Sequence, residues 1–371
     1  MVEICQRYIP EVIKDDKPMI AAIRVDGGDI IGYGHIMRSI GLAEALEDEG
    51  FRPLFYTRLV DGAGVETLRR NGINPTVIPP DVSEEEEPDW ILKHVKTEFG
   101  VPILVAVDGY HFPDDYWLRF QKNTVVLATD VFGGRNYSGV NLLYNGYAHA
   151  FQMDYSQCPE DTGLLLGPGW MITRKEVLNR KPDKPSSQPE RVKRVLINGG
   201  GVDEHDVTGR VASAFANLQP EHIPDEAFFV TGINYPFSDR LNSRLEKLPF
   251  TKRLVQPDNW LDLIASSDLL LISGGQVQYE AAFFGTPYIV LLIEENQRGS
   301  AGAMQEMGIT SVAGWLKDMS DDQILDAYVN ICKDRKKRES FSLKGFQLLD
   351  GLGSKRVAEA CLREVRDKFG K

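Results

Sequence analysis

The chain has 371 residues, 42% of them hydrophobic, which is enough for two or three domains with a core each. Its 42 Lys and Arg stand against 54 Asp and Glu, a formal net charge of −12 without an extended basic patch, so a nucleic-acid partner is not expected. The four cysteines show no paired spacing that would indicate disulfides or a zinc site. The first residues lack the apolar segment of a signal peptide, and no apolar run approaches the roughly 20 residues of a membrane span. We therefore expect a cytoplasmic protein.

The first predicted element is a buried strand over residues 19–25, followed by a helix with apolar residues at helical spacing up to Gly50. Between them lies a loop that contains Gly32 and Gly34 and ends directly before His35. Glycine lets the backbone approach a ligand closely, and the start of a helix presents unpaired amides and a positive dipole end. The loop is therefore predicted to favour an anion, with an imidazole beside it.

The imidazole of His35 is the first candidate for chemistry. A helix start disfavours an imidazolium, so we expect a neutral base that can take a proton from water or from a hydroxyl. A single histidine more often caps or packs, but the flanking glycines, Asp26 and Arg38 favour a functional role here. We name His35, Asp26 and Arg38 as candidate catalytic residues. Whether Asp26, Asp108 or Asp130 orients the ring is left open.

Strand-like and helical segments alternate along the rest of the chain, which predicts parallel sheets covered on both faces. The acidic run over residues 84–87 is expected to be a solvated loop. The predicted division is an N-terminal extension (1–18), a first α/β domain (19–173), a proline-rich polar linker (174–190), a second α/β domain (191–352) and a C-terminal helix (353–371). Ligands bind beyond the carboxyl ends of parallel strands, so two halves that face each other would place the site in the cleft between them.

Two glycine clusters mark the second half, and both follow a predicted strand and precede a helix. The first includes Gly200, and the second consists of Gly274 and Gly275. Both positions suit a phosphate group. Glu280 lies inside the helix that is predicted to start near Gln276, where its carboxylate would accept both hydroxyls of a ribose whose phosphates rest at the helix start.

These residues resemble a known family. The patterns Arg24-x-Asp26, Gly32-x-Gly34-His35-x-x-Arg38 and Leu42-Ala43 resemble the N-terminal signature of the UDP-sugar hydrolase of pseudaminic acid biosynthesis and of related spore coat polysaccharide proteins. The segment Val107-Asp108-Gly109-Tyr110 resembles the family's Asp-x-Tyr strand end. Residues 267–269, 274–275, 279–280, 285–287 and 295–297 resemble its nucleotide-binding half, so that the resemblance covers most of positions 19–312.

The resemblance implies the GT-B fold, in which two Rossmann-like domains face each other across a cleft, and a UDP-sugar as substrate. By this resemblance His35 would activate water for attack at the anomeric carbon, with inversion, while UDP leaves. Glu280 would bind the ribose, Gly274 and Gly275 the diphosphate, and Asn296 with Gln297 the phosphate or the sugar. Asp108, Tyr110, Gly32, Gly34, Gly200 and Gln276 complete the predicted substrate-binding residues. The C-terminal helix is expected to cross back to the first domain.

No metal and no cofactor are expected. Helix amides can stabilise a departing diphosphate without a cation, and the chain contains no Asp-x-Asp motif. His111, His149 and His205 lack a second ligand at metal spacing, so each is expected in a loop or an interface.

Three functions of different class stay open. Hydrolysis of a nucleotide-sugar is the first, and transfer of its sugar to an acceptor hydroxyl by a GT-B glycosyltransferase is the alternative. A binding protein for nucleotide-sugars without turnover is the third. Gln276 and Val277 stand where relatives place a small hydroxyl pair, so the substrate is predicted only as a class. The oligomeric state is left open.

Overall fold

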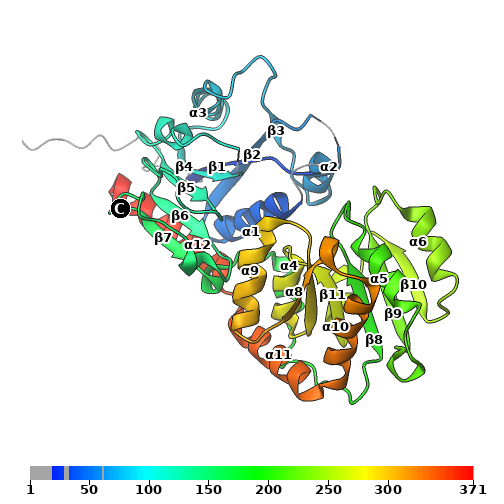
Figure 1. Ribbon diagram of the computed structural model, residues 1–371. Coiled ribbons are helices and arrows are strands. Elements are labelled where there is room, and N and C mark those ends of the chain that lie inside the picture. The colour runs from blue at the N-terminus through cyan, green and yellow to red at the C-terminus, as the bar shows by residue number, and fades with distance from the viewer. Residues whose placement is uncertain (1–18, 29–32, 61, 110, 371) are drawn as a thin grey trace, which may run out of the picture. The chain divides into compact units, whose positions relative to one another are not determined.

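The computed structural model describes residues 19–28, 33–60, 62–109 and 111–370, which form two compact α/β units (Figure 1). Unit 1 contains the described residues up to Gly146, the segment Gln152–Arg174 and the C-terminal segment from Leu352. Unit 2 contains Tyr147–Phe151 and Lys175–Gly351. Each unit thus includes a piece of chain that lies far from the rest of it in sequence.

Unit 1 is built on a parallel sheet of seven strands in the order β3-β2-β1-β4-β5-β6-β7. The strands are β1 (Met19–Val25), β2 (Phe51–Thr57), β3 (Thr76–Val77), β4 (Pro102–Asp108), β5 (Val125–Thr129), β6 (Leu142–Asn145) and β7 (Gly163–Leu166). Its helices are α1 (Gly34–Asp48), α2 (Ala63–Arg70), α3 (Glu87–Glu98) and α12 (Gly353–Phe369), with 3-10 turns at Tyr116–Arg119 and Pro168–Trp170. The predicted strand over residues 19–25 and the helix after it are both present.

Helices cover both faces of this sheet. Alternate residues of β1 point to opposite faces, and nearly all are buried because a parallel strand packs against helices on each side. Ala21 and Ile23 pack with α1 and α12 in one cluster, while Ile20 and Ala22 pack with α3 and Trp117 in another. Helices α1 and α12 thus lie on one face of the sheet and α3 on the other (Figure 1). The C-terminal helix α12 therefore completes the core of unit 1.

The strand register sets the position of the candidate residues in unit 1. Arg24 pairs with Val107 and Val25 with Asp108 in the β1–β4 ladder. All strands are parallel, so their carboxyl ends lie along one edge of the sheet. Asp26 and Asp108 therefore stand at the ends of neighbouring strands.

Unit 2 is built on a second parallel sheet, in the order β10-β9-β8-β11-β12-β13. The strands are β8 (Arg194–Asn198), β9 (Glu226–Thr231), β10 (Thr251–Val255), β11 (Leu269–Ser273), β12 (Tyr288–Leu292) and β13 (Ser311–Trp315). The helices are α4 (Lys175–Leu178), α5 (Val207–Phe215), α6 (Ser238–Leu245), α7 (Trp260–Ser266), α8 (Val277–Phe284), α9 (Glu295–Glu306), α10 (Asp321–Lys333) and α11 (Arg335–Leu348), with 3-10 turns at Pro220–His222 and Leu316–Asp318. A further 3-10 turn, Ala150–Gln152, begins in unit 2 and ends at the first residue of the next unit 1 segment. Helices α5, α6 and α10 share one buried cluster with the strands, and α7 and α8 pack against each other.

Buried polar contacts fix the connecting segments inside each unit. The linker region is held in unit 2 by Arg338, a fully buried guanidinium that donates to the carbonyl oxygens of Pro189 and, at 2.9 Å, Ile331. The segment Tyr147–Phe151 is held there by Ala148, whose amide donates to Tyr279 Oη at 2.8 Å. Among the residues with described positions, no helix combines the length and the apolar character that a membrane crossing requires.

Candidate active site

A buried imidazole–carboxylate pair lies at the carboxyl edge of the sheet in unit 1. His35 is in the first turn of α1, and its Nδ1 lies 2.6 Å from Oδ1 of Asp108, the last residue of β4. Arg38, one turn further along α1, donates from Nε to Asp108 Oδ2 at 2.7 Å and from Nη2 to Oδ1 at 2.6 Å. This two-point contact fixes the carboxylate that holds the ring.

The charge of Asp108 determines the tautomer of His35. Burial alone would raise the pKa of Asp108, but the Arg38 charge, the neighbouring His35 ring and the hydrogen bonds of both hold it well below its usual value. An ionised carboxylate only accepts hydrogen bonds, so His35 Nδ1 must donate. The lone pair of the neutral ring is then on Nε2, the nitrogen that can accept a proton. Asp108 is thus the carboxylate that orients His35, which the sequence had left open.

The other two candidate carboxylates at this edge of the sheet, Asp26 and Asp130, accept hydrogen bonds from groups other than His35. Asp26 Oδ1 accepts from Thr57 Oγ1 and from the amide of Arg58, both at 2.8 Å. Asp130 Oδ2 accepts from Tyr137 Oη and from the amide of Gly133, both at 2.6 Å. The prediction that Asp26 belongs to the catalytic set therefore rests on its position at the strand end.

A second buried charge cluster lies behind Asp26. Arg24, which is 1% exposed, pairs with Asp26 Oδ2 at 2.7 Å and donates from Nε to Glu87. Glu87 also accepts from Arg58 Nε and, at 2.6 Å, from Tyr116 Oη. The expectation that residues 84–87 form a solvated loop is wrong for Glu87, which is buried at the start of α3 because two guanidinium groups compensate its charge.

The structure describes some of the remaining predicted site residues of unit 1 and not others. Gly34 is the first residue of α1 and directly precedes His35. Gly32 and Tyr110 lie outside the described residues. His111 follows β4 and lies 3.6 Å through Nε2 from Asp26 Oδ2, a contact that the sequence analysis did not foresee.

In unit 2 the second glycine cluster forms a tight loop between β11 and α8. The amide of Gly274 donates to Gln297 Oε1 at 3.2 Å, and the amide of Ile293 donates to the same oxygen at 3.1 Å. A Cβ at position 274 would lie 2.8 Å from Gln297 Cβ, so glycine is required here by packing. Gln297 thus joins the loops after β11 and β12. Its predicted contact with phosphate or sugar stays a prediction, as does that of Asn296, which is exposed in the first turn of α9.

Glu280 and Gln276 both have defined partners. Glu280 lies in the first turn of α8, and its Oε2 accepts from Trp260 Nε1 at 3.0 Å. Gln276 precedes α8, and its Oε1 accepts from Tyr147 Oη at 3.3 Å. Gly275 lies between Gly274 and Gln276 in the loop. A carboxylate thus lies in the first turn of α8, and its predicted contact with a ribose stays a prediction.

The first glycine cluster differs from the second because a carboxylate of the chain already occupies its helix start. Asp203 accepts from the amides of Val207 and Thr208 at 2.7 and 3.0 Å, at the start of α5. Burial raises the pKa of Asp203 to about 6, against the lowering effect of these hydrogen bonds. The amide of Gly200 donates to Asn198 Oδ1 at 3.1 Å. The expected phosphate at this cluster would therefore have to compete with internal acceptors, and the role of Gly200 stays a prediction.

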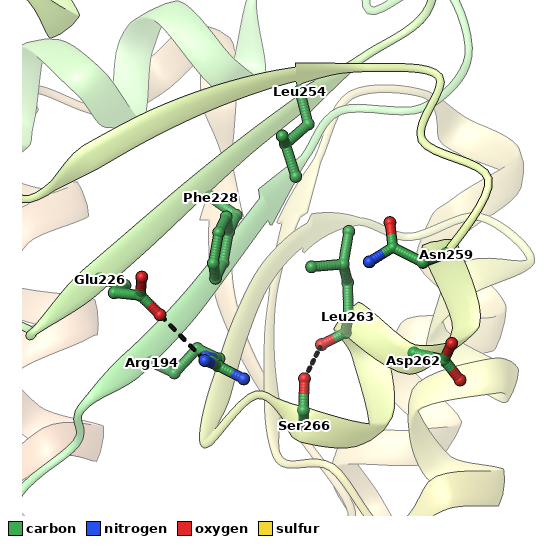
Figure 2. A pocket seen from close by; sticks show the side chains of 8 residues that line it. All are labelled: Arg194, Glu226, Phe228, Leu254, Asn259, Asp262, Leu263 and Ser266. Atoms are coloured by element: carbon green, nitrogen blue, oxygen red, sulfur yellow. Dashed lines mark hydrogen bonds and ion pairs between the residues drawn. The ribbon is translucent and has the colours of Figure 1, made fainter.

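A pocket of about 340 Å³ also lies in unit 2. Arg194 and Glu226, the first residues of β8 and β9, form an ion pair at 2.9 Å in its lining (Figure 2). It is lined by Arg194, Glu226, Phe228, Leu254, Asn259, Asp262, Leu263 and Ser266 (Figure 2). None of the predicted site residues lines it. Within the described ranges, no group of three or more His, Cys, Asp or Glu side chains is arranged to hold a metal ion.

The chain forms two parallel sheets covered by helices, and its C-terminal helix returns to the first unit. This arrangement is the GT-B fold, which similar solved structures share. The Staphylococcus aureus MnaA–UDP co-structure has a TM-score of 0.66 and 15% identity, covering 94% of this chain and 97% of that one. A glycosyltransferase from Rickettsia africae has a TM-score of 0.61 and 12% identity, covering 96% of this chain and all of that one.

A relative in sequence spans nearly the whole chain. The spore coat polysaccharide biosynthesis protein SpsG of Bacillus subtilis is 24% identical over 351 residues, which cover 94% of this chain and 99% of SpsG. No protein-family model matches the chain. The resemblance to spore coat polysaccharide proteins that the motifs indicated is thus confirmed by similarity along the whole length.

Proposed function

We propose that the chain is an enzyme that transfers the sugar of a UDP-sugar to an acceptor hydroxyl. The observation that carries this proposal is the hydrogen bond from His35 Nδ1 to Asp108, which leaves the basic lone pair on Nε2. In the reaction, Nε2 takes the proton of the acceptor hydroxyl, and the acceptor oxygen forms a bond to the anomeric carbon. The bond from that carbon to the diphosphate breaks, and UDP leaves with its electron pair.

Unit 2 supplies the nucleotide site in this proposal. Glu280 binds the ribose hydroxyls, and the loop of Gly274 and Gly275 approaches the diphosphate at the start of α8, where the helix dipole favours negative charge. UDP is the nucleotide named in the MnaA co-structure, which shares the fold. The names of SpsG and of the Rickettsia glycosyltransferase support transfer in polysaccharide synthesis better than hydrolysis.

Hydrolysis is the second candidate, and a specific observation favours it. The pattern around Arg24, Asp26, His35 and Arg38 resembles the signature of a UDP-sugar hydrolase. The same base would then deprotonate water instead of an acceptor hydroxyl, and free sugar would be the product.

A panel of UDP-sugars tests these functions. The purified chain is incubated with each UDP-sugar, with and without saccharide or lipid acceptors, while NMR follows UDP and free sugar. UDP release that depends on an acceptor supports transfer, and equal release of UDP and free sugar in water replaces it with hydrolysis. Tight UDP binding without turnover in any mixture would overturn both and leave a binding protein.

A further inference from the structure

The carboxyl edge of the sheet in unit 1 holds a second imidazole beside a carboxylate. His111 Nε2 lies 3.6 Å from Asp26 Oδ2. Because Val25 pairs with Asp108, Asp26 leaves β1 directly beside the strand end that carries the partner of His35. The pairs His35–Asp108 and His111–Asp26 thus stand at the ends of two adjacent strands, which are about 4.8 Å apart in a sheet.

The carboxylate of this second pair is fixed. Asp26 Oδ1 accepts from Thr57 Oγ1 and from the amide of Arg58, and Arg24 Nη2 lies 2.7 Å from Oδ2. Burial would raise the pKa of Asp26, but the Arg24 charge and these hydrogen bonds lower it below its usual value. Asp26 is therefore an ionised group that can only accept hydrogen bonds.

The ring of His111 is also fixed, yet solvent reaches it. Its centroid lies 4.1 Å from that of Phe112, and a Cβ at Gly109 would come within 3.1 Å of its Cε1. Glycine at position 109 thus makes room for the ring. The His111 side chain is 38% exposed, against 7% for that of Asp26.

The charge state of His111 follows from its neighbours. Burial and the Arg24 charge lower its pKa, while Asp26, Glu84 and Glu87 act in the opposite direction without reversing the shift. The ring is therefore neutral at pH 7, with one nitrogen that donates and one that accepts.

The separation of the pair matches a bridging hydroxyl. A distance of 3.6 Å between His111 Nε2 and Asp26 Oδ2 is longer than a direct hydrogen bond to a carboxylate, for which about 2.7–3.2 Å is usual. At such a distance a third group that both donates and accepts can bridge the two atoms. A hydroxyl can donate to Asp26 Oδ2 and accept from Nε2–H of His111.

We propose that His111 and Asp26 together bind one hydroxyl of the substrate's sugar and so determine which sugars the enzyme accepts. This inference rests on the proposed function, because it needs a nucleotide-sugar whose sugar reaches the edge where His35 acts. A sugar that lacks this hydroxyl, or carries it in the opposite configuration, leaves the pair unsatisfied and is rejected.

The test combines one substitution with a set of sugars. His111→Phe keeps a ring against Phe112 and removes both nitrogens, and His222→Phe changes a partly exposed histidine in unit 2 as a matched control. For each variant, kcat/KM is measured with UDP-glucose, UDP-galactose and UDP-N-acetylglucosamine, and with the mono-deoxy analogues of the best of these substrates. The affinity for UDP alone is measured by calorimetry.

We expect His111→Phe to lower kcat/KM for the best UDP-sugar about 10- to 100-fold while UDP affinity stays at the wild-type value. With the one deoxy analogue that lacks the bridging hydroxyl, wild type and His111→Phe should react equally. A loss of the same size with every analogue would make the role of His111 structural and overturn the proposal, as would wild-type rates throughout. If His111→Phe does not fold, His111→Gln, which keeps an N–H donor, is measured in the same way and must retain the wild-type order of sugars.

Failure of the proposed function is seen separately in the same series. A wild-type chain that binds no UDP, or that turns over no UDP-sugar, contradicts the proposed function and with it this inference. Wild-type turnover combined with no sugar-dependent effect at position 111 contradicts this inference alone.

Discussion

His35 and Asp108 are joined by a 2.6 Å hydrogen bond although 73 positions separate them in the sequence. The bond connects the start of α1 with the end of β4, and Arg38 holds the same carboxylate from one helical turn further on. The geometry resembles the way in which catalytic histidines are generally oriented, with a buried carboxylate on Nδ1 and the basic lone pair on Nε2. The function of unit 1 can therefore be tested at a few defined atoms.

The first prediction concerns the base itself. His35→Ala removes the proton acceptor, and we expect kcat to fall about 10²- to 10⁴-fold, the usual contribution of a general base. UDP affinity should stay within a factor of two or so, because the proposed nucleotide contacts belong to unit 2. Steady-state kinetics and calorimetry measure the two quantities. A His35→Ala protein with near-normal kcat would exclude His35 as the base.

The second prediction concerns the residue that orients the base. Asp108→Asn keeps the size of the side chain but can present an N–H to His35 Nδ1, which favours the wrong tautomer. We expect a loss in kcat of about 10²-fold or more with little change in KM. Asp114→Asn, which changes an exposed carboxylate paired with Arg135, is the matched control and should keep wild-type kinetics. Equal kinetics of the two variants would contradict the orienting role.

The third prediction concerns stability and pH. The pKa of Asp108 is lower in the folded chain than the value of about 3.9 in an unfolded one, so its ionised form stabilises the fold at any pH above that value. This stabilisation is lost as the pH falls below about 4 toward the folded pKa. Asp108→Asn also leaves the buried Arg38 without its counter-ion, which costs about 3–5 kcal/mol at neutral pH. Urea unfolding at pH 7 and pH 3 should show a difference between wild type and variant that is clearly smaller at pH 3, and a constant difference would refute the assignment.

The sequence predicted the local part of this site and missed the part that depends on strand register. His35 could be placed at a helix start because the strand before it and the helix that contains it are close together in sequence. The partner carboxylate could not, since Asp26, Asp108 and Asp130 all follow strands and only the β1–β4 pairing places Asp108 on His35. The same limit explains His111, which gains a partner only when β4 lies beside β1.

The burial of charged side chains could likewise not be predicted from the sequence patterns. An acidic run is usually solvated, but the last residue of this one, Glu87, is buried because Arg24 and Arg58 converge on it from β1 and from the end of β2. The family resemblance predicted Gln297 as a ligand but gave no sign that its Oε1 accepts from two loop amides. Both outcomes depend on contacts between segments far apart in sequence.

The fourth prediction concerns the nucleotide. Glu280→Ala removes the carboxylate that is proposed to accept the ribose hydroxyls, and we expect UDP affinity to fall about 10- to 100-fold. Glu339→Ala, which removes an exposed carboxylate paired with Arg335 on α11, is the matched control and should bind UDP as the wild type does. Calorimetry with UDP and with 2′-deoxy-UDP measures the effect. The Glu280→Ala loss should be smaller for the deoxy nucleotide, and an equal loss would show that Glu280 supports α7 through Trp260 instead.

The last prediction concerns Arg338, whose fully buried guanidinium donates to main-chain carbonyl oxygens. It donates to carbonyl oxygens at the end of α10 and in the linker, including those of Ile331 and Pro189. Arg338→Met fills most of the space but leaves these buried carbonyls unsatisfied, so we expect unit 2 to lose about 2–4 kcal/mol of stability. Arg335→Met, at the exposed start of the same helix, should destabilise the unit much less, because a solvent-exposed ion pair contributes little to stability. Thermal unfolding compares the two variants, and UDP affinity at low temperature should be unchanged in both, because neither side chain belongs to the loop of Gly274. Equal unfolding temperatures for the two variants would show that the linker does not depend on Arg338.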